Sequence, residues 1–364
     1  MLYMRKLLLV LAAVWLLAGQ ARAMDETVSL PPEIWRAAPD AAELISEDPE
    51  DGFGLFSGLG EVLSETLTDM KSIITSGLRS AAAIMAGAVL LGAAESAAPA
   101  GKETLTRCST AIGALWITAV SAGDLNALIG LGRETVTELN VLGKALLPVL
   151  AAAEAAGGGI TAASVRQVAA VFFANLLLSV IEKFLIPAVY LYIGTAAANA
   201  VVDGGALERI GALLKKTISW TLSGLVFLFV TYLTISGAIA GAADARAVAL
   251  AKSAVSAAVP VVGGILSEAA ESVLAGAGLV HGMAGAAGTL ALLGVCLAPF
   301  LHLGCQYLFY QAASLVSAAA GPAKLTKLIS MLGDAFALVL AMVGSAAVVL
   351  LAALLSSMAA VSPG

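Results

Sequence analysis

Charged side chains within apolar stretches are the residues of this sequence best suited to chemistry. Eight of them lie in or beside hydrophobic runs: Glu95, Glu154, Glu182, Lys183, Lys252, Glu268, Glu271 and Asp334. A charge inside a membrane-spanning segment is costly, and such residues often mark ion or proton pathways. Glu268 and Glu271 are three residues apart, so they share one helix face. Two carboxylates on one face can bind a cation or form an exposed polar stripe.

An irregular backbone is predicted between these charges. Pro260, Gly263 and Gly264 follow Lys252 and interrupt a helix. Within residues 247–266, eight Val, Leu or Ile residues favour membrane insertion by about 2.4 to 4.8 kcal/mol. Lys252 opposes it by about 2.5 to 3.5 kcal/mol, so the sum is close to zero. We therefore expect this segment to be interfacial, re-entrant or buried among other helices. The candidate functional residues are Lys252, Pro260, Gly263, Gly264, Glu268 and Glu271.

Catalytic and metal-binding motifs are missing from the sequence. It contains no Walker-type phosphate loop, no H-E-x-x-H and no nucleophile elbow. The three cysteines form no C-x-x-C pair, and we interpret them as buried, inert thiols. With only two histidines, a histidine-based site is not expected. We predict a protein that is not an enzyme and carries neither metal nor cofactor.

The composition predicts a membrane protein. Hydrophobic residues make up 60% of the chain and charged residues 12%, whereas soluble domains are about a quarter charged. The net charge of −6 does not favour nucleic-acid binding. We expect an all-α, polytopic transmembrane helical bundle with interrupted or re-entrant helices and interfacial amphipathic helices. Nine stretches are candidate spans: residues 78–98, 111–131, 139–156, 168–181, 184–202, 220–242, 275–297, 300–320 and 336–360.

The first 77 residues divide into two segments ahead of a membrane domain at 78–364. Residues 1–23 have the three parts of a signal peptide: Arg5 and Lys6, an apolar run, and Ala21-Arg22-Ala23. An uncleaved anchor helix is the alternative. Residues 24–77 are acidic and poor in Lys and Arg, which predicts an extracytoplasmic location. They end in an amphipathic helix at 59–78 that can lie on the membrane or, as we favour, contact a protein.

Basic segments indicate which side of the membrane two loops occupy. Residues 206–220 form a basic amphipathic helix, expected on the cytoplasmic surface, and Lys324 and Lys327 suggest a cytoplasmic loop. If both are cytoplasmic, an even number of crossings separates them, so residues 247–266 must span or form a hairpin.

Two prolines and an adjacent charge pair mark possible interruptions. Pro148 and Pro187 each remove the hydrogen-bond partner of a lysine carbonyl four residues earlier, so kinks are expected. Glu182 and Lys183 can occupy a loop between two short spans. Small residues, including G-x-x-x-G pairs at Gly237/Gly241 and Gly278/Gly282, predict close helix packing, more within one bundle than between copies.

One stretch resembles a known family. The sequence from Ile235 to Gly288 contains Ala251-Lys252, then Pro260-Val261-Val262-Gly263-Gly264, then Glu268-Ala269-x-Glu271. This order resembles the most characteristic region of the stage III sporulation protein AE family. The export signal, the run Ala145-Leu146-Leu147-Pro148-Val149-Leu150 and the hydrophobic C-terminus occur in matching order.

The resemblance implies a subunit of the multiprotein, secretion-like channel that joins mother cell and forespore. It implies a location in the mother-cell membrane facing the forespore. The implied partners are other channel subunits: an ATPase-like protein, ring-forming membrane proteins and a forespore protein. The apolar composition adds membrane lipid as a partner. Further copies of this chain are expected as well.

Three functional classes follow from the sequence. The leading hypothesis is a non-enzymatic channel subunit, required for forespore development after engulfment, with the Lys252–Glu271 region near a pore or helix interface. A stand-alone polytopic permease for a small solute is the alternative, because interrupted helices also form transporter sites. A membrane enzyme ranks third, since no cluster of catalytic groups is evident.

Overall fold

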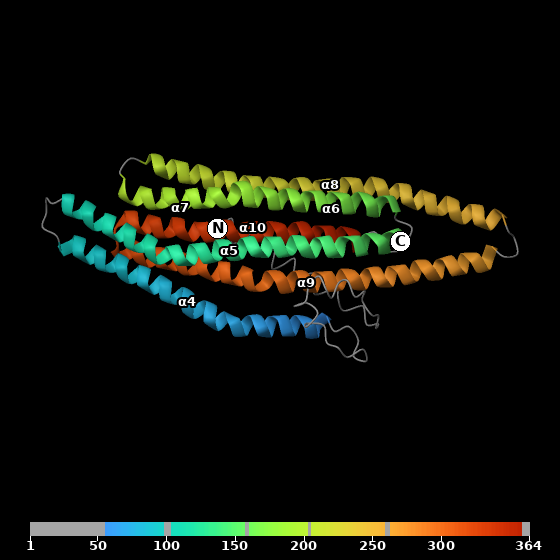
Figure 1. Ribbon diagram of the computed structural model, residues 1–364, viewed down its shortest axis with the longest axis horizontal. Coiled ribbons are helices and arrows are strands. Elements are labelled where there is room, and N and C mark those ends of the chain that lie inside the picture. Colours follow the sequence, from blue (N-terminus) through green and yellow to red (C-terminus); the bar gives the residue numbers. More distant parts are fainter. Residues whose placement is uncertain (1–54, 98–102, 157–159, 203–204, 259–262, 359–364) are drawn as a thin grey trace.

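The computed structural model describes residues 55–97, 103–156, 160–202, 205–258 and 263–358, and these residues form helices without a strand (Figure 1). This confirms the predicted all-α class. The helices are α4 (Leu55–Ala97), α5 (Glu103–Ala156), α6 (Ile160–Val180), the π-helical turn η2 (Ile181–Leu185), α7 (Ile186–Val201), α8 (Ala206–Ala258), α9 (Gly263–Ala320) and α10 (Ala323–Met358). Because α6, η2 and α7 follow without a gap, the described part contains six long rods.

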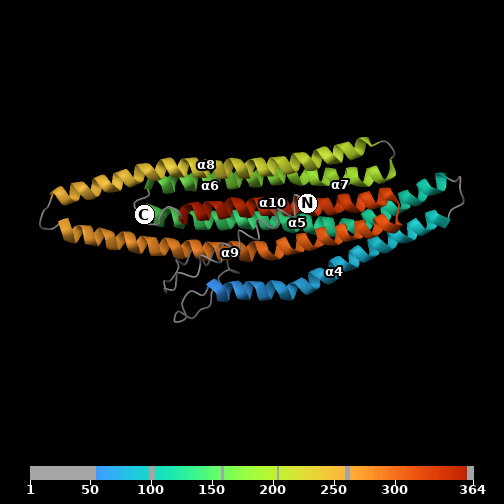
Figure 2. The same cartoon turned by 180° about the vertical axis from the view of Figure 1, so that it is seen from behind.

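Helix α10 is the centre of the bundle. It packs against α5, α6, α7, α8 and α9, while α4 packs mainly against α9 and α5. The view from behind shows the same order, with α8, α6 and α7 along one edge and α9 and α4 along the other (Figure 2). The sequence of α10 suits this place, because it carries no charge after Asp334. Its Leu332, Phe336 and Val343 are almost completely buried.

Glycines allow two of the closest helix contacts. A Cβ atom on Gly92 of α4 would overlap the carbonyl of Ala320 at the end of α9. A Cβ atom on Gly132 of α5 would overlap the side chain of Val339 on α10. Small residues at these two positions therefore let helices of this chain pack closely against one another. The surroundings of the pairs Gly237/Gly241 and Gly278/Gly282 lie outside the described residues.

The division into nine spans is wrong for the described residues. Six helical stretches are long and apolar enough to cross a membrane: Ile74–Ser96, Arg107–Ala152, Gln167–Val201, Ala206–Ile235, Gly288–Ala320 and Ala323–Ser356. Predicted spans 111–131 and 139–156 are parts of α5, and 275–297 and 300–320 are parts of α9. Spans 168–181 and 184–202 belong to the continuous α6–η2–α7 run. Charges and prolines suggest helix ends at these places, but the helices continue because neighbouring helices supply packing and polar partners.

Three connections lie at one end of the bundle: α4–α5, α7–α8 and α9–α10 (Figure 1). Several described basic residues gather near this end, and we call it the basic end. They are Arg107, Arg209, Lys215, Lys216, Lys324 and Lys327. Lys327 forms a salt bridge with Glu208, so the two segments predicted to share the cytoplasmic side are neighbours. Two rods, α8 and α9, separate them, which supplies the even number of crossings. Residues 206–220 are not a separate interfacial helix, since they form the first turns of α8.

The predicted interruption near Pro260 coincides with a change of helix. Helix α8 ends at Ala258 and α9 begins at Gly263. Both helices extend past the ends of α5, α6 and α10 at the end opposite the basic end (Figure 1). Residues 247–266 therefore comprise the end of α8 and the start of α9 together with positions outside the described residues.

The N-terminal predictions are only partly within the described chain. The signal peptide at 1–23 and most of the acidic segment lie outside the described residues. Residues 59–78, predicted as an amphipathic helix, belong to α4.

Candidate functional site

The residues singled out from the sequence lie where α8 and α9 extend past the bundle. Lys252 belongs to α8, and Gly263, Gly264, Glu268 and Glu271 belong to the first turns of α9. Pro260 lies outside the described residues, as do the side chains of the other five. Their proposed roles therefore stay predictions. The described side chains instead bring a different group of charges together in the middle of the bundle.

The π-helical turn η2 has a local cause in the sequence. Pro187 has no N–H, and its ring would clash with the carbonyl of Lys183 in a regular α-helix. The chain accommodates this with one wider turn, in which the N–H of Ile186 donates to the carbonyl oxygen of Ile181. Glu182 and Lys183 therefore lie within a continuous helical run, and the alternative of a loop between two short spans is wrong. Such π-turns occur frequently at functional sites.

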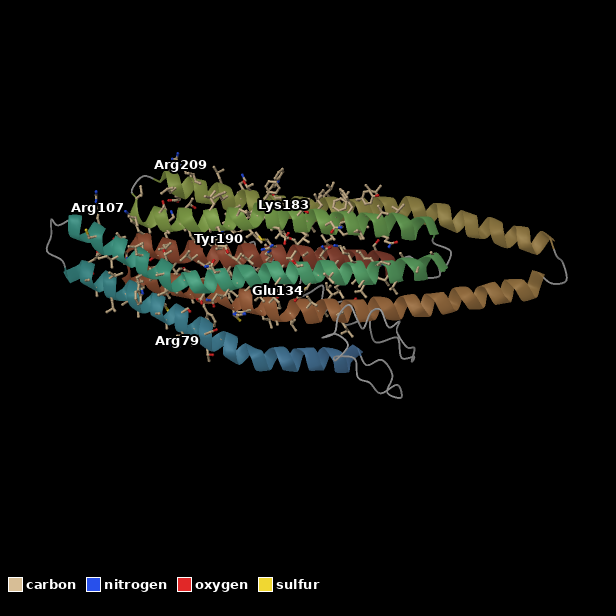
Figure 3. The ribbon with its side chains drawn as sticks, viewed as in Figure 1. Arg79, Arg107, Glu134, Lys183, Tyr190 and Arg209 are labelled. Atoms are coloured by element: carbon tan, nitrogen blue, oxygen red, sulfur yellow. The ribbon has the colours of Figure 1, made fainter. Side chains whose placement is uncertain are left out.

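Arg133 of α5 pairs with Glu182 of η2. The Nε atom of Arg133 donates to Oε1 of Glu182 over 3.2 Å, and the two side chains are 62% and 33% exposed. Two turns further along α7, the hydroxyl of Tyr190 donates to Oδ1 of Asn126 over 3.2 Å. Both contacts join α5 to the α6–η2–α7 run on the outside of the bundle. Glu134, Lys183 and Tyr190 lie along the middle of the long axis, away from Arg107 and Arg209 at the basic end (Figure 3).

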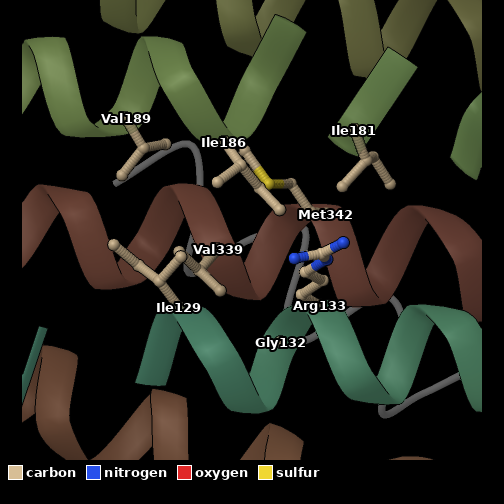
Figure 4. A pocket seen from close by; sticks show the side chains of 8 residues that line it. All are labelled: Ile129, Gly132, Arg133, Ile181, Ile186, Val189, Val339 and Met342. Carbon is tan, nitrogen blue, oxygen red and sulfur yellow. The ribbon is translucent and has the colours of Figure 1, made fainter. Parts of the chain in front are cut away.

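A narrow apolar crevice lies beneath the Arg133–Glu182 pair. It is lined by Ile129, Gly132, Arg133, Ile181, Ile186, Val189, Val339 and Met342, from α5, η2, α7 and α10 (Figure 4). Apart from Arg133, every lining side chain is apolar or absent. Since Gly132 approaches Val339 so closely, this side of α5 is fixed against α10. The opposite side of α5 must then face outward.

The outward side of α5 is polar over a long distance. Asn126, Arg133, Thr137 and Lys144 are exposed, and at 100° per residue they fall within about 40° of one another on the helix. Glu134 and Glu138 are exposed beside them, and Gly130 lies on the same face, where an added Cβ atom would have nothing within 4 Å. We define the polar face as these residues together with the neighbouring charges of η2. Its members are Asn126, Gly130, Arg133, Glu134, Thr137, Glu138, Lys144, Glu182 and Lys183.

Two further polar clusters lie between helices. In the first, Oδ2 of Asp124 on α5 accepts from Nε2 of Gln306 over 2.9 Å and from the hydroxyl of Tyr310 over 3.4 Å, both on α9. In the second, Asp334 on α10 pairs with Lys215 of α8 over 2.7 Å and accepts from the hydroxyl of Tyr192 on α7 over 3.4 Å.

Each cluster gives an intramembrane carboxylate partners from other helices, which fits a structural role. Tyr192 is 2% exposed and Tyr310 is fully buried. Among the described residues, no three or more His, Cys, Asp or Glu side chains are grouped to hold a metal. Cys108, predicted to be buried, is exposed, while Cys296 is buried and Cys305 is partly buried.

Comparison with protein families decides the family of the chain. The model of the family described as stage III sporulation protein AE matches residues 59–361. The chain belongs to the stage III sporulation protein AE family. The resemblance noted in the sequence is therefore confirmed over most of the chain. No curated protein and no solved structure matched the chain.

Membership in the stage III sporulation protein AE family makes this a sporulation protein, and the six apolar helices in its described part indicate a multi-pass membrane protein. The sequence interpretation missed the polar face of this family member, because Arg133 and Glu134 fall between the predicted spans 111–131 and 139–156. The regular spacing of Asn126, Gly130, Arg133, Thr137 and Lys144, by three, four or seven residues, is the signal that indicates one helix face. Asp124 lies inside a predicted span, and no local pattern indicates its partners on α9.

Proposed function

We propose that this chain is a non-enzymatic membrane subunit of a sporulation-specific, secretion-like channel that connects mother cell and forespore. The family match over residues 59–361 carries the proposal. The six apolar rods of the described part carry an exposed polar face, which suits a subunit that assembles with others. A bundle surrounded by lipid alone exposes apolar side chains instead. The development of the forespore after engulfment would depend on this subunit.

The distribution of basic residues supports one orientation in the mother-cell membrane. Lys and Arg accumulate on the cytoplasmic side of membrane proteins, so the basic end faces the mother-cell cytoplasm. Helix α4 runs toward that end, and α10 runs away from it (Figure 1). The start of α4 and the end of α10 then both lie toward the forespore side. This agrees with an export signal preceding the acidic segment.

The proposed partners are other subunits of the channel and further copies of this chain. Helices α8 and α9 extend past the bundle on the forespore side in this orientation. That projection offers a contact region away from the lipid-facing helices. Lys252, Glu268 and Glu271 are the charged candidates within it.

Deletion of the gene in its spore-forming host tests the proposal. We expect sporulation to proceed through engulfment and then to stop, with loss of forespore gene expression and of heat-resistant spores. Fluorescent reporters of forespore transcription and a heat-resistance titre measure the two effects. Expression of the intact chain from another locus is the control.

A solitary permease, the alternative from the sequence, predicts a different outcome. The deletion strain would complete sporulation when the missing solute is supplied in the medium. Normal spore yield without any supplement would overturn both ideas.

A further inference from the structure

The polar face has the length of a membrane crossing. From Asn126 to Lys144 the helix rises 1.5 Å per residue, or about 27 Å in total. The hydrocarbon core of a bilayer is about 30 Å thick. The polar side chains recur over this distance, and Val141 is the only large hydrophobic residue exposed on this length of α5. Together they form a long stripe instead of a ring at one end of a helix.

Contact of this stripe with lipid would be costly. A charged side chain at the centre of a spanning helix strongly opposes insertion into the bilayer. The polar face carries three basic and three acidic residues: Arg133, Lys144, Lys183, Glu134, Glu138 and Glu182. The Arg133–Glu182 pair relieves part of this cost, but Arg133 is still 62% exposed.

A second exposed face at the same depth has the opposite character. Tyr192 and Lys215 both contact Asp334, so they lie at one level. Lys183 lies nine residues further from the basic end than Tyr192, and Gly224 on α8 lies nine residues further from it than Lys215. Lys183 and Gly224 therefore lie at about the same level. Around Gly224, the large exposed residues of α8 are Trp220, Phe227 and Leu228, which are 77%, 73% and 55% exposed. No charge occurs on α8 between Lys216 and Asp244. This is the surface expected against lipid.

We infer that the polar face of α5 and η2 lines a water-filled path across the membrane, whose opposite wall belongs to another subunit. The inference deepens the proposed channel function and rests on it. Water solvates the exposed charges, whereas lipid cannot. A water-filled path therefore removes the cost of placing these charges in the bilayer. Gly130 adds room near the Asn126 end of the stripe, since nothing lies within 4 Å of a Cβ atom built there.

The charges also predict what such a path would pass. Pores lined by rings of one sign select ions of the opposite sign. Here the lining carries equal numbers of both signs, so it has no strong preference for cations or anions. The path would admit small hydrated solutes and discriminate by size.

Accessibility of introduced cysteines tests the inference in the assembled complex. In a chain with Cys108, Cys296 and Cys305 replaced by serine, we would introduce Gly130→Cys, Thr137→Cys or, as the matched control at similar depth, Gly224→Cys. At neither glycine does an added Cβ atom have a neighbour within 4 Å, so folding should be preserved. Membranes of sporulating cells are treated with a charged, membrane-impermeant methanethiosulfonate, and each variant is checked for protein level and spore yield.

The expected result is modification at positions 130 and 137 faster than at 224 by on the order of tenfold or more, because the reactive thiolate forms in water. Equally slow modification at all three positions would overturn the inference. Unreactive thiols at 130 and 137 that form disulfide cross-links to another chain would overturn it as well, because they indicate a dry interface. The deletion experiment separates this failure from failure of the channel proposal. If the deletion blocks sporulation and the thiols are unreactive, the water-filled path is overturned and the channel proposal stands.

Discussion

The outer faces of α5 and α8 are both exposed but chemically opposite. At one depth, α8 presents Trp220 and Phe227, while α5 presents Arg133 and Glu134. Both helices pack against α10. Exposure in a membrane bundle therefore does not mean exposure to lipid. The residue types on the exposed face indicate which solvent or partner that face meets.

A bulky residue added to each face should distinguish the two faces most strongly. Gly130→Trp on α5 should block the path and reduce the titre of heat-resistant spores toward that of the deletion strain. Gly224→Trp on α8 should leave the titre close to that of the unmodified chain, since the added indole meets lipid beside Trp220. Both glycines have open space around them, so immunoblots should show normal levels of both proteins. Equal spore titres for the two variants would remove the functional difference between the faces.

The two sides of α5 can be compared with two glycines only two residues apart. Gly132→Ala places a methyl group against Val339 and should destabilise the bundle by about 1 to 3 kcal/mol. Gly130→Ala meets nothing and should be neutral or stabilise the helix by about 0.5 to 1 kcal/mol. Denaturant unfolding of the purified protein in detergent measures both values. If Gly130→Ala were the more damaging change, α5 would have the opposite side outward.

The ion pair between α8 and α10 and the ion pair on the polar face should contribute differently to stability. Asp334→Asn removes the charge that pairs with Lys215 in a half-buried site, and we expect a loss of about 1 to 3 kcal/mol, reduced from the fully buried case by partial exposure. Glu182→Gln should cost only about 0 to 1 kcal/mol, because water screens the exposed Arg133–Glu182 pair.

The salt dependence of these two variants provides the control. Added salt should diminish the effect of Glu182→Gln and change that of Asp334→Asn much less. The same unfolding measurement, repeated at two ionic strengths, checks this. A Glu182→Gln effect larger than that of Asp334→Asn would mean that the polar face is sealed from water.

The sequence predicted the membrane class and family of this chain better than the places where its helices end. Apolar length and composition identify α10 without tertiary information, and Pro260 with Gly263 and Gly264 marks the change from α8 to α9. The basic residues of the 206–220 segment and Lys327 predict that the two segments share one side of the membrane, and the structure brings them together at one end of the bundle.

The errors arose where charge was interpreted as a loop. Glu182 was a possible loop residue and Arg133 fell between two predicted spans, yet each lies in the middle of a rod and the two pair across 49 residues of sequence. A partner at that separation is set by tertiary packing, so local patterns do not show it. The close fit of Gly132 against Val339, which turns the polar side of α5 outward, is equally a property of the packed bundle.

The five residues of η2 also determine which side chains of α7 face the neighbouring helices. A π-turn adds one residue to an α-helix, which turns everything after it by about 100° and shifts it by about 1.5 Å. Without that residue, Tyr192 would point away from Asp334 and Tyr190 away from Asn126, although the sequence of α7 would be unchanged. A single proline at 187 thus aligns the half of this rod nearest the basic end with both of its neighbours.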